Sequence, residues 1–304
     1  MATSRFIKDS GLTARMTLTM FLLGALFVGL VALVISYVNS AGGAVAVAAI
    51  AIGIAFWQWW SSDKVAMRAM RAREVSPEEA PELHGMIDRL CALADMPKPR
   101  VGVSDLPVAN AFATGRSPER AVVCVTTGIL HKLDAEELEA VLAHELSHVA
   151  HRDVLVMTIA SSAGIAAGLL MRFTQFGGMG RSRGNNNSAL PVALVVLVAS
   201  LLVYAVSFVM LRVLSRYREL CADRSGAYLT MKPAALASAL QKISGESAAA
   251  TPTKDLRTAN SASALCIVPA FAGGISGLMA THPPLQQRLE QLARIQAELS
   301  RPNG

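Results

Sequence analysis

The chain has 304 residues, of which 53% are hydrophobic and 16% are charged, with a formal net charge of +6 at pH 7. This apolar composition indicates an integral membrane protein. The positive charge could suggest nucleic-acid binding, but Lys and Arg cluster at the ends of apolar runs, where anionic lipid headgroups account for them. The sequence has no nucleic-acid motif and no phosphate-binding glycine-rich loop, so we expect neither a nucleic-acid partner nor a nucleotide.

Four apolar runs are long enough to cross a bilayer, and they cover residues 16–38, 41–60, 154–171 and 190–211. The first two predict a hairpin, and three tryptophans near its end stand where an aromatic belt would lie. A cleaved signal peptide is the alternative for the first run, but its length and the apolar segment after it favour a retained hairpin. Buried core helices or re-entrant segments are the alternative for the last two runs. Because both flanks of the hairpin are basic, the N-terminus and the residues after Trp60 are predicted to be cytoplasmic.

The chain between the two pairs of spans has the patterns of a small folded domain. Apolar residues at 100–103 and 121–126 predict two short strands that flank a glycine-containing turn. Residues 76–79 and 134–137 have the pattern of capping boxes that open two helices, the first running to about Asp95. Four scattered cysteines lack the paired spacing of a zinc knuckle and fit reduced thiols in a cytoplasmic domain.

Residues 144–148, His-Glu-Leu-Ser-His, have the pattern of a zinc site. Positions i and i+4 share one face of an α-helix, so His144 and His148 can each present a ring nitrogen to one metal ion. Glu145 is offset by about 100° around the helix axis, where it can take a proton from the metal's water. A surface pair or a structural metal clip is the alternative. His84, His131 and His151 match no catalytic motif and are expected at the surface or at interfaces.

A catalytic zinc usually has three protein ligands, and Glu219 is the best candidate for the third. Glu219 and Asp223 share one helical face, so one carboxylate could bind zinc while the other accepts the spare N–H of a ligand histidine. A solvated helix face is the alternative. Two spans separate His148 from Glu219 and return the chain to the same side, with both residues roughly 10 Å from the membrane boundary. These positions predict a site at the cytoplasmic surface of the bilayer.

The chain resembles an HtpX-type protease of the membrane zinc-metallopeptidase group that also includes the CAAX prenyl protease. The resemblance covers essentially the whole chain. Four motifs carry it: residues 110–115 (Asn-Ala-Phe-Ala-Thr-Gly), the histidine motif continued to Asp153, Glu219 with Asp223, and Thr281-His282-Pro283-Pro284 followed by Arg288.

The resemblance implies a role for each matching residue of the metal site. His144, His148 and Glu219 would bind one Zn²⁺ per chain. Glu145 would be the general base and acid, and Asp223 would orient a ligand histidine.

The resemblance also implies substrate contacts. Asn110, Ala111 and Phe112 would lie at the edge of a small sheet, to which a substrate segment adds as an extended strand; a structural hairpin is the alternative. His282, supported by Arg288, would donate to the oxyanion or cap the zinc, and a helix-cap role is equally open.

Sequence and resemblance together predict a mainly α membrane protein with a small β-sheet, four transmembrane helices and a cytoplasmic zincin-like catalytic domain split by the second transmembrane hairpin. The predicted domains are an N-terminal hairpin (1–63), the first half of the catalytic domain (64–153), a second hairpin (154–211) and the second half of the catalytic domain (212–304).

By the same resemblance the protein would be a zinc endopeptidase of a bacterial inner membrane. It would cleave misfolded, unfolded or damaged membrane proteins under stress, as part of protein quality control, and would be able to cleave itself. A prenyl-protein processing protease is one alternative, although it would need a larger helical barrel than four spans supply. A non-catalytic zinc-stabilised membrane adaptor is another, and the presence of Glu145 beside the ligands argues against it.

Overall fold

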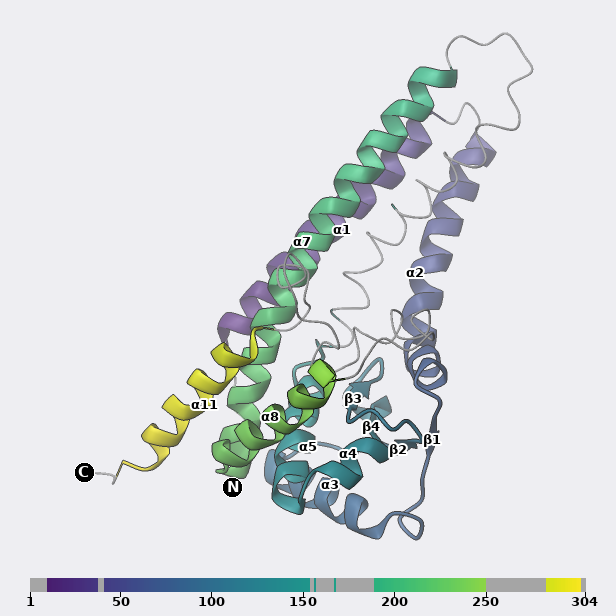
Figure 1. Ribbon diagram of the computed structural model, residues 1–304. Helices are drawn as coiled ribbons and strands as arrows, with labels where there is room; N and C mark the ends of the chain where they lie inside the picture. The colour runs from purple at the N-terminus through teal and green to yellow at the C-terminus, as the bar shows by residue number, and fades with distance from the viewer. Residues whose placement is uncertain are drawn as a thin grey trace. The chain divides into compact units, whose positions relative to one another are not determined.

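The computed structural model describes residues 10–37, 41–153, 156, 167, 189–249 and 283–301 (Figure 1). The chain divides into two compact units. Unit 1 contains Met1–Leu12, Ser62–Leu155 and Ser215–Gly304, and unit 2 contains Thr13–Ser61 and Val156–Leu214. The domain boundaries expected from the sequence stay predictions.

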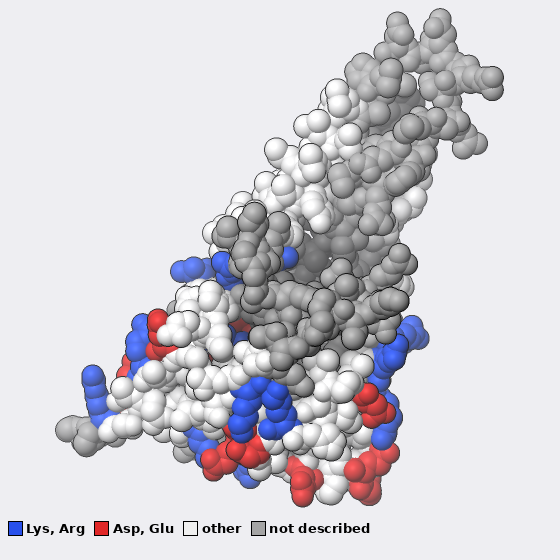
Figure 2. Space-filling model, in the orientation of Figure 1, with Lys and Arg blue, Asp and Glu red and all other residues white. Residues whose placement is uncertain are grey.

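Three described helices are long and apolar enough to cross a membrane. They are α1 (Ser10–Ser36), the Ala41–Ser61 part of α2 (Ala41–Ala69) and the Leu194–Thr230 part of α7 (Ala189–Thr230). Phe21, Val45 and Leu202 on these helices are 71%, 70% and 62% exposed, which suits side chains that face lipid. In Figure 2 charged side chains gather over the elements of unit 1, whereas the described span helices are almost entirely white on the face shown. Residues 154–171 lie almost wholly outside the described residues, so the number of four spans stays a prediction.

Unit 1 contains a sheet whose described strands run in the order β1-β2-β4-β3. The strands are β1 (Ala72–Glu74), β2 (Arg100–Ser104), β3 (Ala111–Thr114) and β4 (Val122–Thr126). β2 and β4 are parallel, and the two outer strands are antiparallel to their neighbours. Every residue of β4 is buried, as expected for a continuous apolar strand covered on both faces. β3 is therefore an edge strand among the described strands, and α5 (Ala135–Ala150) packs against it.

Helix α5 is fixed at its first turn by the capping box predicted from the sequence. The Asp134 side chain accepts from the Glu137 amide at 2.9 Å, and the Glu137 side chain accepts from the Asp134 amide at 3.1 Å. The buried Glu137 carboxylate also accepts from Ser238 and Lys242 of α8 (Pro233–Ala249), each at 2.6 Å. These bonds tie α5 to α8 and hold the helix that carries the histidine motif.

Two local predictions are wrong. Ser76 and Glu79 do form the reciprocal bonds of a capping box, but α3 (Pro81–Ala94) begins only at Pro81. The reason is that a residue before proline is pushed out of the helical region, and Ala80 has φ −139°. The strands predicted at 100–103 and 121–126 exist, but they do not flank a simple turn, because β3 lies between them in the chain.

Candidate metal centre

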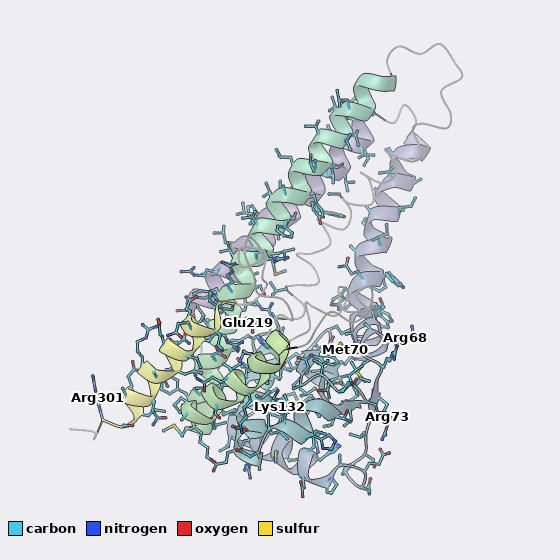
Figure 3. All side chains as sticks on the ribbon, in the orientation of Figure 1. Arg68, Met70, Arg73, Lys132, Glu219 and Arg301 are labelled. Atoms are coloured by element: carbon cyan, nitrogen blue, oxygen red, sulfur yellow. The ribbon has the colours of Figure 1, made fainter. Side chains whose placement is uncertain are left out.

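Helix α5 and the part of α7 that belongs to unit 1 bring the three predicted metal ligands together. α5 carries His144 and His148, and α7 carries Glu219, which lies near the first turns of α11 (Leu285–Leu299) in Figure 3. The Nε2 atoms of the two histidines are 3.3 Å apart. The Glu219 carboxylate lies 3.5 Å from Nε2 of His144 through Oε2 and 3.4 Å from Nε2 of His148 through Oε1. All three side chains are buried, and together they could hold a metal ion.

The spacing of these ligand atoms fits a tetrahedral ion. Two atoms bound at about 2.0–2.1 Å with a tetrahedral angle between them lie about 3.3 Å apart. The separations of 3.3, 3.4 and 3.5 Å agree with this value. Neutral imidazoles and a carboxylate this close together in a buried site need a positive charge between them, either a bound metal ion or a proton on one of the rings. Nitrogen and oxygen ligands in this number suit a divalent transition metal.

Gly226 allows α7 to approach α5 closely at the ligands. A Cβ atom at this position would lie 3.0 Å from the amide nitrogen of His144 and 3.2 Å from its Cα. Gly226 follows Asp223 by three residues and therefore lies on the same face of the helix. The backbones of the two helices thus meet where the ligands must converge.

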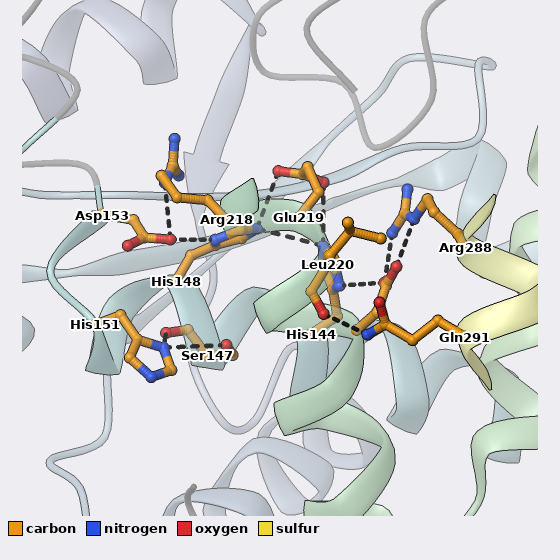
Figure 4. Close-up of polar contacts among 11 residues, drawn as sticks. His144, Ser147, His148, His151, Asp153, Arg218, Glu219, Leu220, Arg288 and Gln291 are labelled. Carbon is orange, nitrogen blue, oxygen red and sulfur yellow. Dashed lines mark hydrogen bonds and ion pairs between the residues drawn. The ribbon is translucent and has the colours of Figure 1, made fainter. Parts of the chain in front are cut away.

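Asp223 contacts His144 at Nδ1, the ring nitrogen that does not face the other candidate ligands. Nδ1 of His144 lies 2.9 Å from Oδ1 of Asp223, and Arg288 of α11 donates to both oxygens of that carboxylate at 2.7 and 2.6 Å. Figure 4 labels His144 and Arg288 and draws these contacts as dashed lines to the carboxylate between them. A carboxylate at Nδ1 favours the tautomer that carries its proton there, which leaves the Nε2 lone pair for a metal ion.

Metal binding to this site should release a proton. Burial alone would lower the pKa of His144, but its contacts with Asp223 and Glu219 outweigh burial and raise the pKa to about 10 in the metal-free protein. His144 is then protonated at pH 7, so a metal ion must displace that proton. We expect metal affinity to rise with pH, by about tenfold per unit below this pKa. Calorimetry at pH 7 in two buffers of different ionisation enthalpy should report about one proton released per Zn²⁺; heats that do not depend on the buffer would contradict this.

A second carboxylate contacts the other histidine. Nδ1 of His148 donates to Oδ2 of Asp153 at 2.7 Å, and Nε of Arg218 lies 2.9 Å from the same oxygen. Burial alone would raise the pKa of Asp153, but the charge of Arg218 and the bond from His148 outweigh it and lower the pKa. The sequence motifs include Asp153 but indicate no role in the site for it or for Arg218. Asp153 follows His148 by five residues, and Arg152, with φ 57°, turns the chain back towards that histidine.

Three of the residues expected to contact substrate, Asn110, Ala111 and Phe112, lie on or next to β3. The Asn110 carbonyl accepts from the Thr126 amide at 2.9 Å, so position 110 bonds to β4. Because bonding direction alternates along an antiparallel strand, the main-chain groups of Ala111 and Ala113 point away from β4, towards the edge of the described sheet. The Phe112 side chain is buried in a core cluster that includes Val122 and Cys124. Phe112 therefore contributes to the strand through its packing.

A small cavity connects the end of β3 with the metal cluster. Its volume is about 10 Å³, close to the space that one water molecule needs. The lining residues are Thr114, Gly115, Arg116, Ser117, Ala121, His148, Val149 and Arg152. Gly115 has φ +139°, and a side chain there would collide with the backbone of Ala121. The glycine therefore permits the turn that follows the edge strand.

The remaining predicted residues are placed as follows. Glu145 is buried on α5 beside His144. His282 lies outside the described residues, so its role and the support expected from Arg288 stay predictions. Arg288 itself donates to Asp223. His84 was expected at the surface or at an interface, and the surface placement is wrong, because its ring is buried and Nε2 lies 3.0 Å from the Val75 carbonyl oxygen.

Residues 77–296 match the model of peptidase family M48. The chain belongs to this family, and with its candidate membrane helices it is a membrane metalloprotease.

Relatives that match over almost all of the chain identify the type of protease within this family. The chain is 53% identical over 298 residues to "Protease HtpX homolog 1" of Streptomyces coelicolor, covering 97% of this chain and 96% of that protein. It is 49% identical to "Protease HtpX homolog" of Moorella thermoacetica (96% of each chain) and 39% identical to that of Pyrococcus furiosus (95% and 98%). The resemblance to HtpX-type proteases is confirmed. Among solved structures, Ste24p of S. mikatae matches at 17% identity and a TM-score of 0.49, over 91% of this chain and 63% of that one.

Proposed function

We propose that the protein is a zinc endopeptidase that cleaves misfolded or damaged membrane proteins. The observation that carries the proposal is the spacing of the buried ligand atoms of His144, His148 and Glu219, at 3.3–3.5 Å, with Glu145 next to the first ligand on the same helix. A structural metal site would have no need of that carboxylate. Two histidines and one glutamate are three protein ligands, the number typical of a catalytic zinc site and one fewer than a structural zinc site usually has.

In peptide-bond hydrolysis at this site, the metal ion and the protein side chains would have different roles. When bound, zinc supplies Lewis-acid polarisation of the scissile carbonyl and of the attacking water. Glu145 takes the proton of that water as general base and passes it to the leaving amine nitrogen as general acid. His144, His148 and Glu219 would hold the ion, and Asp223 would keep the His144 ring in the orientation that binding requires.

The substrate would bind as an added strand beside β3. The main-chain groups of Ala111 and Ala113 point towards that edge, so an extended segment could pair with them through its own backbone. Backbone hydrogen bonds depend little on the amino-acid sequence of the substrate. They do require the substrate segment to be unfolded, so that its main chain is accessible. This requirement supports misfolded or damaged membrane proteins as the substrate class.

We place the protein in a bacterial inner membrane with its site at the cytoplasmic face. Basic residues on both sides of the first hairpin support this orientation through the positive-inside rule. The protein would act in protein quality control under stress and would be able to cleave itself. Both parts of the proposal rest on the likeness to HtpX-type proteases.

The proposal predicts metal-dependent cleavage of an unfolded membrane-protein segment. Detergent-purified protein, stripped of metal with a chelator and then reloaded with Zn²⁺, should cut such a segment, whereas the stripped protein should not. The same segment in its folded state is the control and should survive. Zinc binding without cleavage would contradict the proposal and favour an adaptor that only binds client strands.

A further inference from the structure

The two candidate histidine ligands have similar neighbours on the Nδ1 side of the ring. These neighbours are Asp223 and Arg288 for His144, and Asp153 and Arg218 for His148. In each case a carboxylate faces Nδ1 of the ring, at 2.9 and 2.7 Å, and an arginine faces the carboxylate. The sequence gives no hint of this match, because Asp223 stands on a helix and Asp153 follows the end of another.

The His148 contact determines which ring nitrogen is available. An ionised carboxylate only accepts hydrogen bonds, so the 2.7 Å contact places the ring proton of His148 on Nδ1. The Nε2 lone pair then points to Nε2 of His144, 3.3 Å away, and to Glu219. Asp153 therefore specifies both the tautomer and the direction of this ligand.

Arg218 in turn supports Asp153. Both side chains are buried, and a buried carboxylate is costly unless a positive charge or several hydrogen bonds compensate it. Arg218 directly precedes Glu219 on α7, so one helix supplies a metal ligand and the partner of the carboxylate behind another ligand. The arginine thus links the position of Glu219 to the orientation of His148.

We propose that Asp153 and Arg218 are positioning residues for the metal ligand His148, as Asp223 and Arg288 are for His144. The inference rests on the metal site of the proposed function. Neither residue touches the ion; Asp153 acts through His148, and Arg218 acts through Asp153.

The test measures Zn²⁺ affinity of the full-length protein in detergent with a competing chelator. In Asp153→Asn one oxygen still accepts, and the new amide group replaces Oδ1, which has no hydrogen-bond partner among the described residues. Loss of the charge should weaken Zn²⁺ binding about 10- to 100-fold. Arg218→Met should weaken it in the same direction by a smaller factor, and Arg218→Lys should restore most of that loss. The double variant Asp153→Asn with Arg218→Met should match Asp153→Asn alone, because Arg218 acts only through Asp153.

A purely structural role would give a different result. Asp153→Asn would then unfold at a lower temperature without metal, but the folded protein would keep the wild-type Zn²⁺ affinity and the wild-type absorption bands of bound Co²⁺. That outcome would overturn the inference, as would additive losses in the double variant. Glu136→Gln, which removes the carboxylate from an exposed ion pair with Lys232 at the start of α5, is the matched control and should bind Zn²⁺ as wild type does. If wild-type protein itself binds no Zn²⁺, the proposed metal site fails; if only the variants fail to differ from it, this inference fails alone.

Discussion

Replacing Glu145 with glutamine should reduce cleavage of an unfolded membrane-protein segment by about 10²- to 10⁴-fold while zinc stays bound. Glutamine has nearly the size and shape of glutamate, so the buried site on α5 should keep its packing. The amide cannot take a proton from the attacking water, so the variant loses the general base and the acid that later protonates the amine. The ligands His144, His148 and Glu219 are unchanged, and metal content should remain at the wild-type level.

The measurement pairs a single-turnover cleavage rate with the zinc content of the same sample. Glu136→Gln makes the same chemical change at an exposed position of the same helix and should cleave at the wild-type rate. A Glu145→Gln protein that binds zinc and still cleaves at the wild-type rate would assign the base to another residue. A variant that loses its zinc would instead show that Glu145 helps to build the site. Self-cleavage fragments, if they form, should disappear in the same variant.

The cluster of candidate metal ligands could be predicted from sequence because its residues follow helical periodicity. His144 and His148 are one turn apart on α5, and Glu219 and Asp223 are one turn apart on α7, so each pair shares a face whatever the rest of the fold does. The distance in sequence between the two helices did not matter, since the ligand chemistry itself requires them to meet. Helical periodicity could not predict which carboxylate contacts which histidine.

The contact between Asp153 and His148 could not be predicted from helical periodicity. Helix α5 ends at Ala150, and the positive φ of Arg152 reverses the chain, so that a residue off the helical pattern reaches His148. Such a left-handed turn at a residue other than glycine has no clear sequence signal. The short strand β1 (Ala72–Glu74) was not predicted for a related reason. Three residues without apolar alternation form a strand only because β2 offers an edge to pair with.

Replacing Arg288 with methionine should destabilise unit 1 more than any surface change. Arg288 is 1% exposed, and its guanidinium makes two bonds to the Asp223 carboxylate, which is itself fully buried. Methionine fills much of the space but leaves Asp223 as a buried charge without its arginine. Removal of one partner from such a pair costs about 3–5 kcal/mol. Helix α11 should also dock less firmly, since the Arg288 pair supplements its packing through Leu292 and Ile295.

The double variant Arg288→Met with Asp223→Asn separates stability from metal binding. It removes both charges, so the free energy of unfolding of the metal-free protein should recover most of what Arg288→Met loses. Zinc affinity should not recover, because His144 still lacks the anionic carboxylate at Nδ1 that sets its tautomer. Urea unfolding in detergent gives the first quantity and chelator competition gives the second. Recovery of both in the double variant would show that Asp223 and Arg288 only hold α11 to α7, whereas wild-type stability in Arg288→Met would show that the ion pair contributes little to the fold.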